Sequence, residues 1–182
     1  MIFIITLGVI IVALVFWIIS VQRFFVALDE NINNALSQIG VQLSSRWDAL
    51  TSLLDLTKGY ASHEYNTMTE IIKARRSITK DSSPHDITKQ ENIIAEAMGK
   101  IMAVAESYPD LKADKTYIKT MDDVNEYENM VRTSRLIYND SVTKLNRNIR
   151  MFPASMIAGI LGFSQRVYLE EVDEKVNMPS MK

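Results

Sequence analysis

Apolar residues recur every three or four positions over residues 23–58, as one face of an α-helix requires, and polar residues fill the remaining positions. The spacing predicts a helix of about ten turns with one continuous apolar stripe. The stripe consists of Phe25, Leu28, Ile32, Ala35, Ile39, Leu43, Trp47, Leu50, Leu54 and Thr57. We expect the rest of the chain to cover this stripe.

The stretch before it, residues 1–21, contains no charged side chain, and its polar ones are Thr6 and Ser20. About twenty apolar residues can cross the roughly 30 Å hydrocarbon core of a bilayer. A buried core helix would keep a polar face, and a cleaved signal peptide would need a positive start and a small-residue site. We therefore predict a transmembrane helix, and Arg23, the only charge near it, favours a cytoplasmic body.

Glycine and proline signals divide the next part of the chain. Gly59 suits the end of the long helix, and a shorter helix is predicted over 63–79. Residues 80–86 combine proline with serine and aspartate side chains that compete for backbone hydrogen bonds, which predicts a loop.

Two further helices follow that loop. A capping box at Thr88 opens one that ends before Pro109, and the other is predicted over 115–152, where Pro153 stops it. Their predicted inward faces are Ile94, Ala97, Ile101, Val104, Ala105 and Tyr108, and then Tyr117, Met121, Val124, Tyr127, Val131, Ser134, Tyr138, Val142, Leu145, Ile149 and Phe152. Two long and two short helices predict an all-α fold: a transmembrane helix followed by an antiparallel up-and-down four-helix bundle.

This topology would return the end of the last helix toward the membrane end of the first. The apolar segment that follows, residues 155–163, is too short to cross a bilayer. It has two interpretations: contact with the lipid interface or the transmembrane helix, or a flap that closes the bundle core. The candidate membrane or interface residues are Ile157, Ile160, Leu161 and Phe163.

Length and composition limit the remaining possibilities. The chain of 182 residues has room for one domain plus an anchor, which we place at 22–163 and 1–21, with an acidic mobile tail at 164–182. The 20 basic and 22 acidic residues nearly balance and form no basic block, which excludes nucleic acid as a partner. The absence of cysteine excludes disulfides, thiol nucleophiles and thiolate metal sites.

No catalytic, cofactor-binding or metal-binding residue is predicted. His63 and His85, the two histidines, lack the spacing of a metal site, and a capping or packing role fits His63 better. No serine lies in a nucleophile turn, and no glycine loop is suited to phosphate.

Polar residues near the stripe have structural interpretations. A buried Arg46 paired with a carboxylate would fix the helix register, whereas an exposed Arg46 would cover Trp47 with its aliphatic stem. We expect the exposed arrangement. The tyrosines of the later helices are expected in the core with their hydroxyls at the surface; they are Tyr108, Tyr117, Tyr127 and Tyr138.

Several short motifs follow one another in a specific order. They are Gln38-Ile39, Val41-Gln42-Leu43, Arg46-Trp47-Asp48, Lys58-Gly59-Tyr60-Ala61-Ser62, Glu106-Ser107-Tyr108-Pro109-Asp110, Tyr138-Asn139, Phe152-Pro153 and Ile157-Ala158-Gly159. In this series the chain resembles the bacterial LemA family, and the resemblance implies a transmembrane segment followed by a four-helix bundle. The chain departs from the family at Leu145, where a second tyrosine is common, and at Ser155, where asparagine is usual. The resemblance implies no catalytic residue.

These observations lead us to expect a non-enzymatic, single-pass membrane protein that serves as a helical scaffold or assembly protein at the membrane surface. Its expected partners are the lipid bilayer and further copies of itself. The alternative is an adaptor or regulator of a neighbouring membrane protease or sensor kinase. A membrane hydrolase is the least supported class, because no reactive site accompanies the helices.

Overall fold

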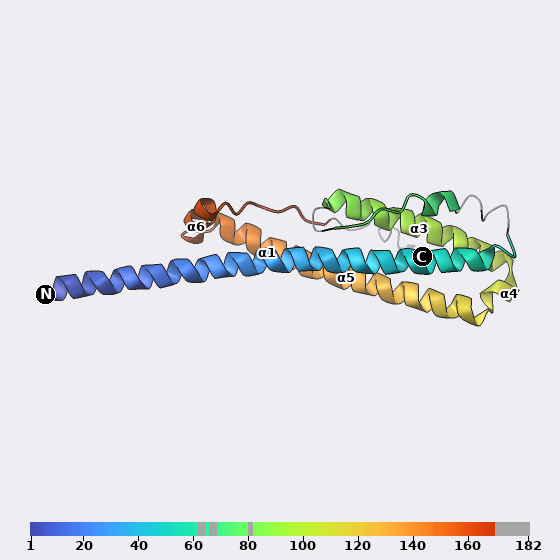
Figure 1. The fold of residues 1–182 in the computed structure, drawn as a ribbon, viewed down its shortest axis with the longest axis horizontal. Helices are drawn as coiled ribbons and strands as arrows, with labels where there is room; N and C mark the ends of the chain where they lie inside the picture. Colours follow the sequence, from blue (N-terminus) through green and yellow to red (C-terminus); the bar gives the residue numbers. More distant parts are fainter. Residues whose placement is uncertain (62–64, 66–68, 80–81, 170–182) are drawn as a thin grey trace, which may run out of the picture. The chain divides into compact units, whose positions relative to one another are not determined.

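The computed structural model is all-α and describes residues 1–61, 65, 69–79 and 82–169 (Figure 1). Its helices are α1 (Ile2–Thr57), α3 (Pro84–Ser107), α4 (Pro109–Lys112), α5 (Lys115–Arg150) and α6 (Ala154–Leu161). Residues 69–72 are also helical. The predicted all-α class with a long apolar N-terminal helix is confirmed.

The predicted transmembrane helix and the striped helix are one continuous helix, α1. All ten positions of the predicted stripe are buried, and Phe25, Ile32, Ile39 and Leu50 are completely inaccessible. The helix ends at Thr57, and a turn over 58–60 follows, as Gly59 predicted. One face of α1 therefore supplies core residues along the whole length that follows the apolar segment 1–21.

The chain forms two compact units. Unit 1 comprises Met1–Asn34 and Ile137–Tyr168, and unit 2 comprises Ala35–Leu136 together with Leu169. In unit 1, buried side chains of α1 are joined by Val142 and Leu145 from the end of α5.

Unit 2 is built from the second part of α1, α3, α4 and the first part of α5. Its largest fully buried side chain is Trp47. The other large apolar side chains of this core are Ile39, Leu43, Leu50, Leu53, Ile87, Ile94, Ile101, Leu111, Val124 and Val131. Each helix thus contributes the apolar face that its sequence period predicts.

α3 begins earlier than the sequence predicted. Ser83, rather than Thr88, caps the helix, and Pro84 occupies its first position. The Ser83 hydroxyl oxygen accepts a hydrogen bond from the Asp86 backbone N–H at 3.2 Å, and the Asp86 carboxylate accepts one from the Ser83 N–H at 3.0 Å. The hydroxyl and backbone hydrogen bonds from Ser83 lower the pKa of the Asp86 carboxyl. The predicted loop is shorter because this box ends it.

The predicted helix over 63–79 is wrong at its C-terminal end, where residues 75–79 have no regular structure. Near its beginning, residues 63–64 and 66–68 lie outside the described residues. Side chains take the place of the helical hydrogen bonds: the Arg76 N–H donates to Gln90 Oε1 at 2.8 Å, and Gln90 Nε2 donates to the Ala74 carbonyl at 3.4 Å. Arg75 also donates to Asp48 at 2.6 Å. Contacts to α3 and α1 therefore override the local helical pattern.

The later helices differ from the predictions at their ends. Pro109 begins the short helix α4 instead of only ending α3, and Tyr108 is 38% exposed. α5 ends at Arg150, so Phe152 leaves the helical register and is 80% exposed. The other residues of the predicted inward face of α5 are buried or half-buried.

Gly40 of α1 provides a test of the packing against residues 75–79. A Cβ atom at this position would lie 2.6 Å from the Ile78 carbonyl oxygen, whereas a Cβ at Gly99 of α3 would meet nothing within 4 Å. We expect Gly40→Ala to destabilise the chain by about 1–3 kcal/mol through overpacking. Gly99→Ala should instead stabilise it by up to about 1 kcal/mol through helix propensity. Thermal unfolding followed by circular dichroism in detergent measures both, and equal melting temperatures for the two variants would contradict the packing.

Candidate functional site

The apolar end of unit 1 is the candidate functional site, and α6 is its central element. The helix ends at Leu161 and is capped by Gly162, whose φ of 76° lies in the left-handed region that glycine tolerates best. The Phe163 N–H then donates to the Ala158 carbonyl at 3.0 Å. This ending turns the chain so that the Phe163 ring stacks on the Phe25 ring of α1, with centroids 5.1 Å apart.

The structure separates the four predicted site residues into two pairs. Ile160 is 80% exposed and Leu161 is 45% exposed, whereas Ile157 and Phe163 are half-buried beside the fully buried Ala158. One side of α6 therefore packs into unit 1, and the other side presents apolar side chains outward. Contact of the outward side with a membrane stays a prediction.

Polar contacts that the sequence analysis did not predict hold the segment after α6, and we call the contacts of Arg166 and Val167 with Asn146, Asp29 and Tyr138 the latch. Asn146 Nδ2 donates to the Arg166 carbonyl at 2.8 Å, and Asn146 Oδ1 accepts from the Arg166 N–H at 2.9 Å. The Arg166 side chain pairs with Asp29 of α1 at 2.9 Å. The Tyr138 hydroxyl donates to the Val167 carbonyl at 2.9 Å, and burial raises the pKa of Tyr138. The described start of the predicted tail is thereby fixed to α5 and α1.

The signal for this latch was present in the sequence as an asparagine on the inward side of α5. Asn146 is 7% exposed, and a buried amide needs partners for both its oxygen and its nitrogen. An extended backbone can offer one N–H and one C=O together, which matches the amide. The sequence alone did not show which segment supplies them.

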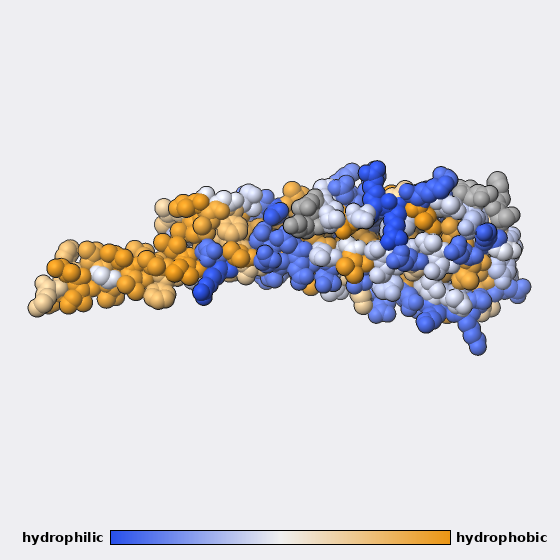
Figure 2. Space-filling model, in the orientation of Figure 1, coloured by the Kyte–Doolittle hydropathy of each residue, from blue (hydrophilic) through white to orange (hydrophobic). Residues whose placement is uncertain are grey.

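Apolar side chains dominate the outer surface of unit 1. Residues 1–16 are all exposed, and Trp17 and Val21 are half-buried. Among the described residues, α1 is the helix that is long and apolar enough to cross a membrane by length and composition. Figure 2 shows hydrophobic residues over this part of α1 and over α6.

Unit 2 contains a different candidate feature, a cluster of buried and partly buried charges that joins its helices. Arg135 of α5 pairs with Glu91 of α3, and the two side chains are only 11% and 9% exposed. Arg46 of α1 pairs with Glu128 of α5 at 3.3 Å, and Glu128 also pairs with Arg132 at 3.3 Å. We call Arg46, Glu91, Glu128 and Arg135 the charge cluster.

The charge cluster corrects the expectation for Arg46, which is 7% exposed rather than a surface charge. Its partner is Glu128, while the neighbouring Asp48 pairs with Arg75. Burial raises the pKa of the Glu91 carboxyl, although the charges of Arg135 and Arg46 act in the opposite direction. The cluster is therefore suited to fixing the register of three helices, the role that a buried arginine and carboxylate would have.

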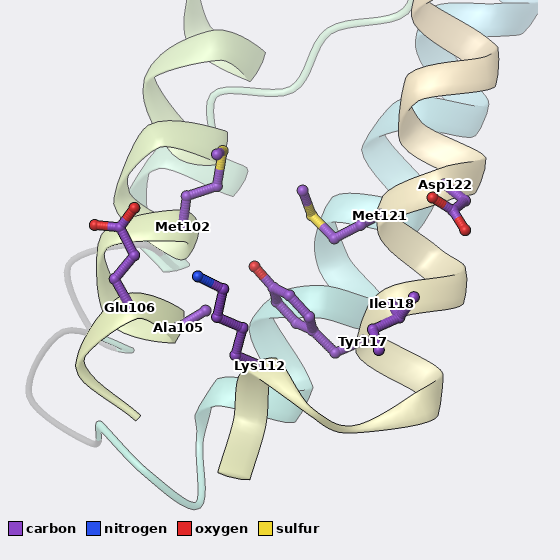
Figure 3. Close-up of a pocket in the computed structure, with 8 residues that line it drawn as sticks. All are labelled: Met102, Ala105, Glu106, Lys112, Tyr117, Ile118, Met121 and Asp122. Atoms are coloured by element: carbon purple, nitrogen blue, oxygen red, sulfur yellow. The ribbon is translucent and has the colours of Figure 1, made fainter. Parts of the chain in front are cut away.

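A pocket of about 270 Å³ lies between α3, α4 and α5 in unit 2 (Figure 3). Its lining is mainly apolar, and three charged side chains stand around it. The lining residues are Met102, Ala105, Glu106, Lys112, Tyr117, Ile118, Met121 and Asp122. Burial, and next the charge of Glu106, raises the pKa of Tyr117. A pocket of this size suits one large apolar side chain better than a typical small-molecule ligand.

The described part of the chain has no group of three or more histidine, aspartate or glutamate side chains that could hold a metal ion. His85 is exposed in the first turn of α3, and His63 lies outside the described residues. The clustered charges of unit 2 pair with one another across helices. This arrangement favours a structural role for these side chains over a role in proton transfer.

Comparison with known proteins agrees with the family resemblance that the short sequence motifs indicated. A model of the LemA family matches residues 35–182. The chain belongs to the LemA family. The matched region begins within α1, after the apolar segment 1–21.

Relatives of this LemA-family chain include proteins with two different names. Magnetosome protein MamQ 2 of Paramagnetospirillum magneticum is 25% identical over 88% of this chain and 69% of its own length. Magnetosome protein MamQ of Magnetospirillum gryphiswaldense is 24% identical over 81% of this chain and 64% of its own length. Protein LemA of Metamycoplasma hominis is 28% identical over 71% of this chain and 60% of its own length. The chain thus spans roughly two thirds of these relatives.

The charge cluster makes a testable prediction about unit 2. Glu91→Leu leaves Arg135 buried without its partner, which should destabilise the chain by about 3–5 kcal/mol. Adding Arg135→Met should recover more than half of this loss, because the pair is then replaced by apolar side chains. Urea unfolding in detergent measures both variants.

Glu96→Leu is the matched control on α3, since Glu96 pairs with Lys100 at the surface. Its effect should stay within about 0.5 kcal/mol. A loss for Glu91→Leu as small as that of this control would show that the buried pair does not hold the helices.

Proposed function

We propose that this LemA-family chain is a non-enzymatic, single-pass membrane protein whose helical body serves as a scaffold or assembly protein at the membrane surface. Residues 1–21 would be the anchor, and residues 22–163 the body. The body would have the topology of an antiparallel up-and-down four-helix bundle, in which residues 69–79 take the place of a full fourth helix.

The exposed apolar surface of the first part of α1 is the observation that carries this proposal. No residue of its most apolar stretch is buried. Soluble monomeric proteins rarely expose apolar patches of this extent, whereas a bilayer covers one of about twenty residues. The helix needs no other partner for its backbone, because its hydrogen bonds are satisfied internally.

Two observations support a scaffold over an enzyme. The buried charges described in unit 2 pair across helices, and the pocket between α3 and α5 is lined mainly by apolar groups. The names of the relatives, LemA and magnetosome protein MamQ, also denote no reaction.

We propose that the body faces the cytoplasm. Arg23 lies two residues after the apolar segment 1–21, and unit 1 also presents Arg147 and Arg150 in the last turn of α5. Positive charges close to a transmembrane helix favour the cytoplasmic side.

Self-assembly would use the exposed surface of α5. Leu136 is 67% exposed, the highest exposure among the large apolar side chains of that helix. Anchoring confines copies of the chain to one plane, which raises their effective concentration. A modest apolar contact is then enough for association.

Disulfide crosslinking in carbonate-washed native membranes tests anchoring and assembly together. The chain has no cysteine, so Leu136→Cys introduces a single thiol. We expect the protein to remain in the washed membranes and to form a crosslinked dimer at low and high expression. Lys89→Cys on the exposed side of α3 is the control and should crosslink at least about tenfold less, because association through α5 keeps that position apart.

The two parts of the proposal fail in different ways. Release of the chain by carbonate would contradict the membrane anchor. Retention in the membrane with only monomer at every expression level would contradict assembly.

The pocket in unit 2 supports a second candidate, an adaptor for a neighbouring membrane protease or sensor kinase. Met102 and Met121 reach toward the pocket from opposite helices (Figure 3). Methionine side chains adapt to different apolar surfaces, as adaptor grooves require. An inserted apolar side chain of the partner would be the central contact.

Co-purification in mild detergent distinguishes the adaptor from the scaffold. If the chain is an adaptor, Met121→Lys should reduce the co-purified protease or kinase by about tenfold or more, since a charge in the pocket opposes apolar insertion. Lys119→Glu, an exposed change on the same helix outside the pocket lining, should leave the yield unchanged. Recovery of the chain with itself alone would reject the adaptor.

A further inference from the structure

The charged side chains of residues 141–169, the stretch that contains α6, are all basic. From Ser141 to Leu169 the chain contains no aspartate or glutamate, while Arg147 and Arg150 are exposed in the last turn of α5. α6 begins at Ala154, four residues after Arg150. Its outward side chains and those just before it are apolar: Phe152 is 80% exposed, Met156 61%, Ile160 80% and Leu161 45%.

Two of the acidic side chains of unit 1 already have basic partners. Asp140 pairs with Lys144 at 2.6 Å, and Asp29 pairs with Arg166 at 2.9 Å. The third, Glu30, is exposed on α1. These pairs neutralise the charges of Lys144 and Arg166, and they do not include Arg147 or Arg150 at the end of α5.

Among the described residues, no ion pair engages Arg147 or Arg150. Arg150 Nε donates to the Asn146 carbonyl at 3.3 Å, a contact that orients the guanidinium without neutralising it. The C-terminal end of α5 favours cations nearby, but it supplies only partial charge. Two guanidinium groups therefore precede the exposed apolar helix α6 without an ion pair to any acidic side chain that the structure describes.

We propose that α6, Arg147 and Arg150 form a docking surface for a membrane leaflet that contains anionic phospholipid. Ile160 and Leu161 would enter the boundary between headgroups and acyl chains, and the guanidiniums would bind lipid phosphates. Guanidinium matches phosphate with paired hydrogen bonds, and an interfacial helix binds more strongly where apolar insertion and anionic lipid act together.

The position of α6 relative to α1 supports this occupant. The stacking of Phe163 on Phe25 holds the end of α6 against α1, and Phe25 follows the apolar segment 1–21 by four residues. Four residues correspond to a rise of about 6 Å along a helix, so α6 would lie at the level of the headgroups when residues 1–21 cross the bilayer. This inference rests on the proposed anchor and adds a preference for one lipid class.

Depth-dependent quenching in the full-length chain tests the docking surface. Ile160→Cys carries an environment-sensitive fluorophore, since the chain has no other thiol, and the protein is reconstituted in nanodiscs. One set contains phosphatidylcholine alone, and in the other phosphatidylglycerol replaces a third of it. Quenching by spin-labelled lipid should rise about twofold or more with phosphatidylglycerol and fall back when salt is raised.

Variants assign the effect to the two arginines. Arg147→Gln with Arg150→Gln should remove the response to phosphatidylglycerol, while Arg147→Lys with Arg150→Lys should retain at least part of it. The matched control, Lys115→Gln with Lys119→Gln, removes the same charge from the other end of α5 and should leave the response unchanged. Equal far-ultraviolet circular dichroism of all variants establishes that they are folded.

The outcomes separate this inference from the proposed function. A label that is quenched equally in both lipid compositions would overturn the preference for anionic lipid and leave the anchored scaffold intact. A label at Ile160 that is never quenched would overturn the docking surface, while a second label at Val12→Cys tests the anchor by itself. A response that survives the double glutamine change would show that Arg147 and Arg150 do not carry it.

Discussion

Burial of one face of α1 is the interaction on which both units depend. In unit 1 that face is buried together with residues of α5 and α6, and in unit 2 with residues of α3, α4 and α5. A fully buried large apolar side chain contributes about 1.5–3 kcal/mol, whereas a typical hydrogen bond contributes about 0.5–1.5 kcal/mol. Eight of the ten stripe positions, from Phe25 to Leu54, carry such large apolar side chains, and their burial therefore dominates the stability of the body. Because α1 is unbroken, the same helix that fills the core also carries the exposed apolar segment 1–21.

Polar contacts decide which segments meet along that apolar face. Apolar stripes pack with little directional preference, so they allow neighbouring helices to slide by a turn. The pair of Glu91 and Arg135 joins α3 to α5, and the two hydrogen bonds of Asn146 bind the backbone of Arg166. A shift of one turn would leave each of these buried groups without its partner. These contacts therefore contribute more to the specific alignment of the segments than to the net stability of the fold.

The chain belongs to the LemA family, and its relatives include proteins named LemA and magnetosome protein MamQ. The buried charges of unit 2 and the latch of unit 1 hold segments of the chain together. The structure also gives unit 1 a distinct surface, where the outward side of α6 combines apolar side chains with the arginines at the end of α5. A scaffold that touched the bilayer there as well as through residues 1–21 would have a fixed orientation, which a single transmembrane helix could not give.

The sequence by itself determined the class of the fold, the apolar faces of α1, α3 and α5, and the apolar character of α6. Helical period and the absence of charge over residues 1–21 depend only on neighbouring positions, so local patterns suffice for them. Tertiary structure decided what depends on groups distant in the chain. Residues 75–79 make hydrogen bonds to Gln90 and Asp48 in place of the predicted helix. Arg46 is buried, and it pairs with Glu128. The turn at Gly162 brings the Phe163 ring onto the Phe25 ring. No local pattern specifies these partners, because each is supplied by a part of the chain that only folding brings near.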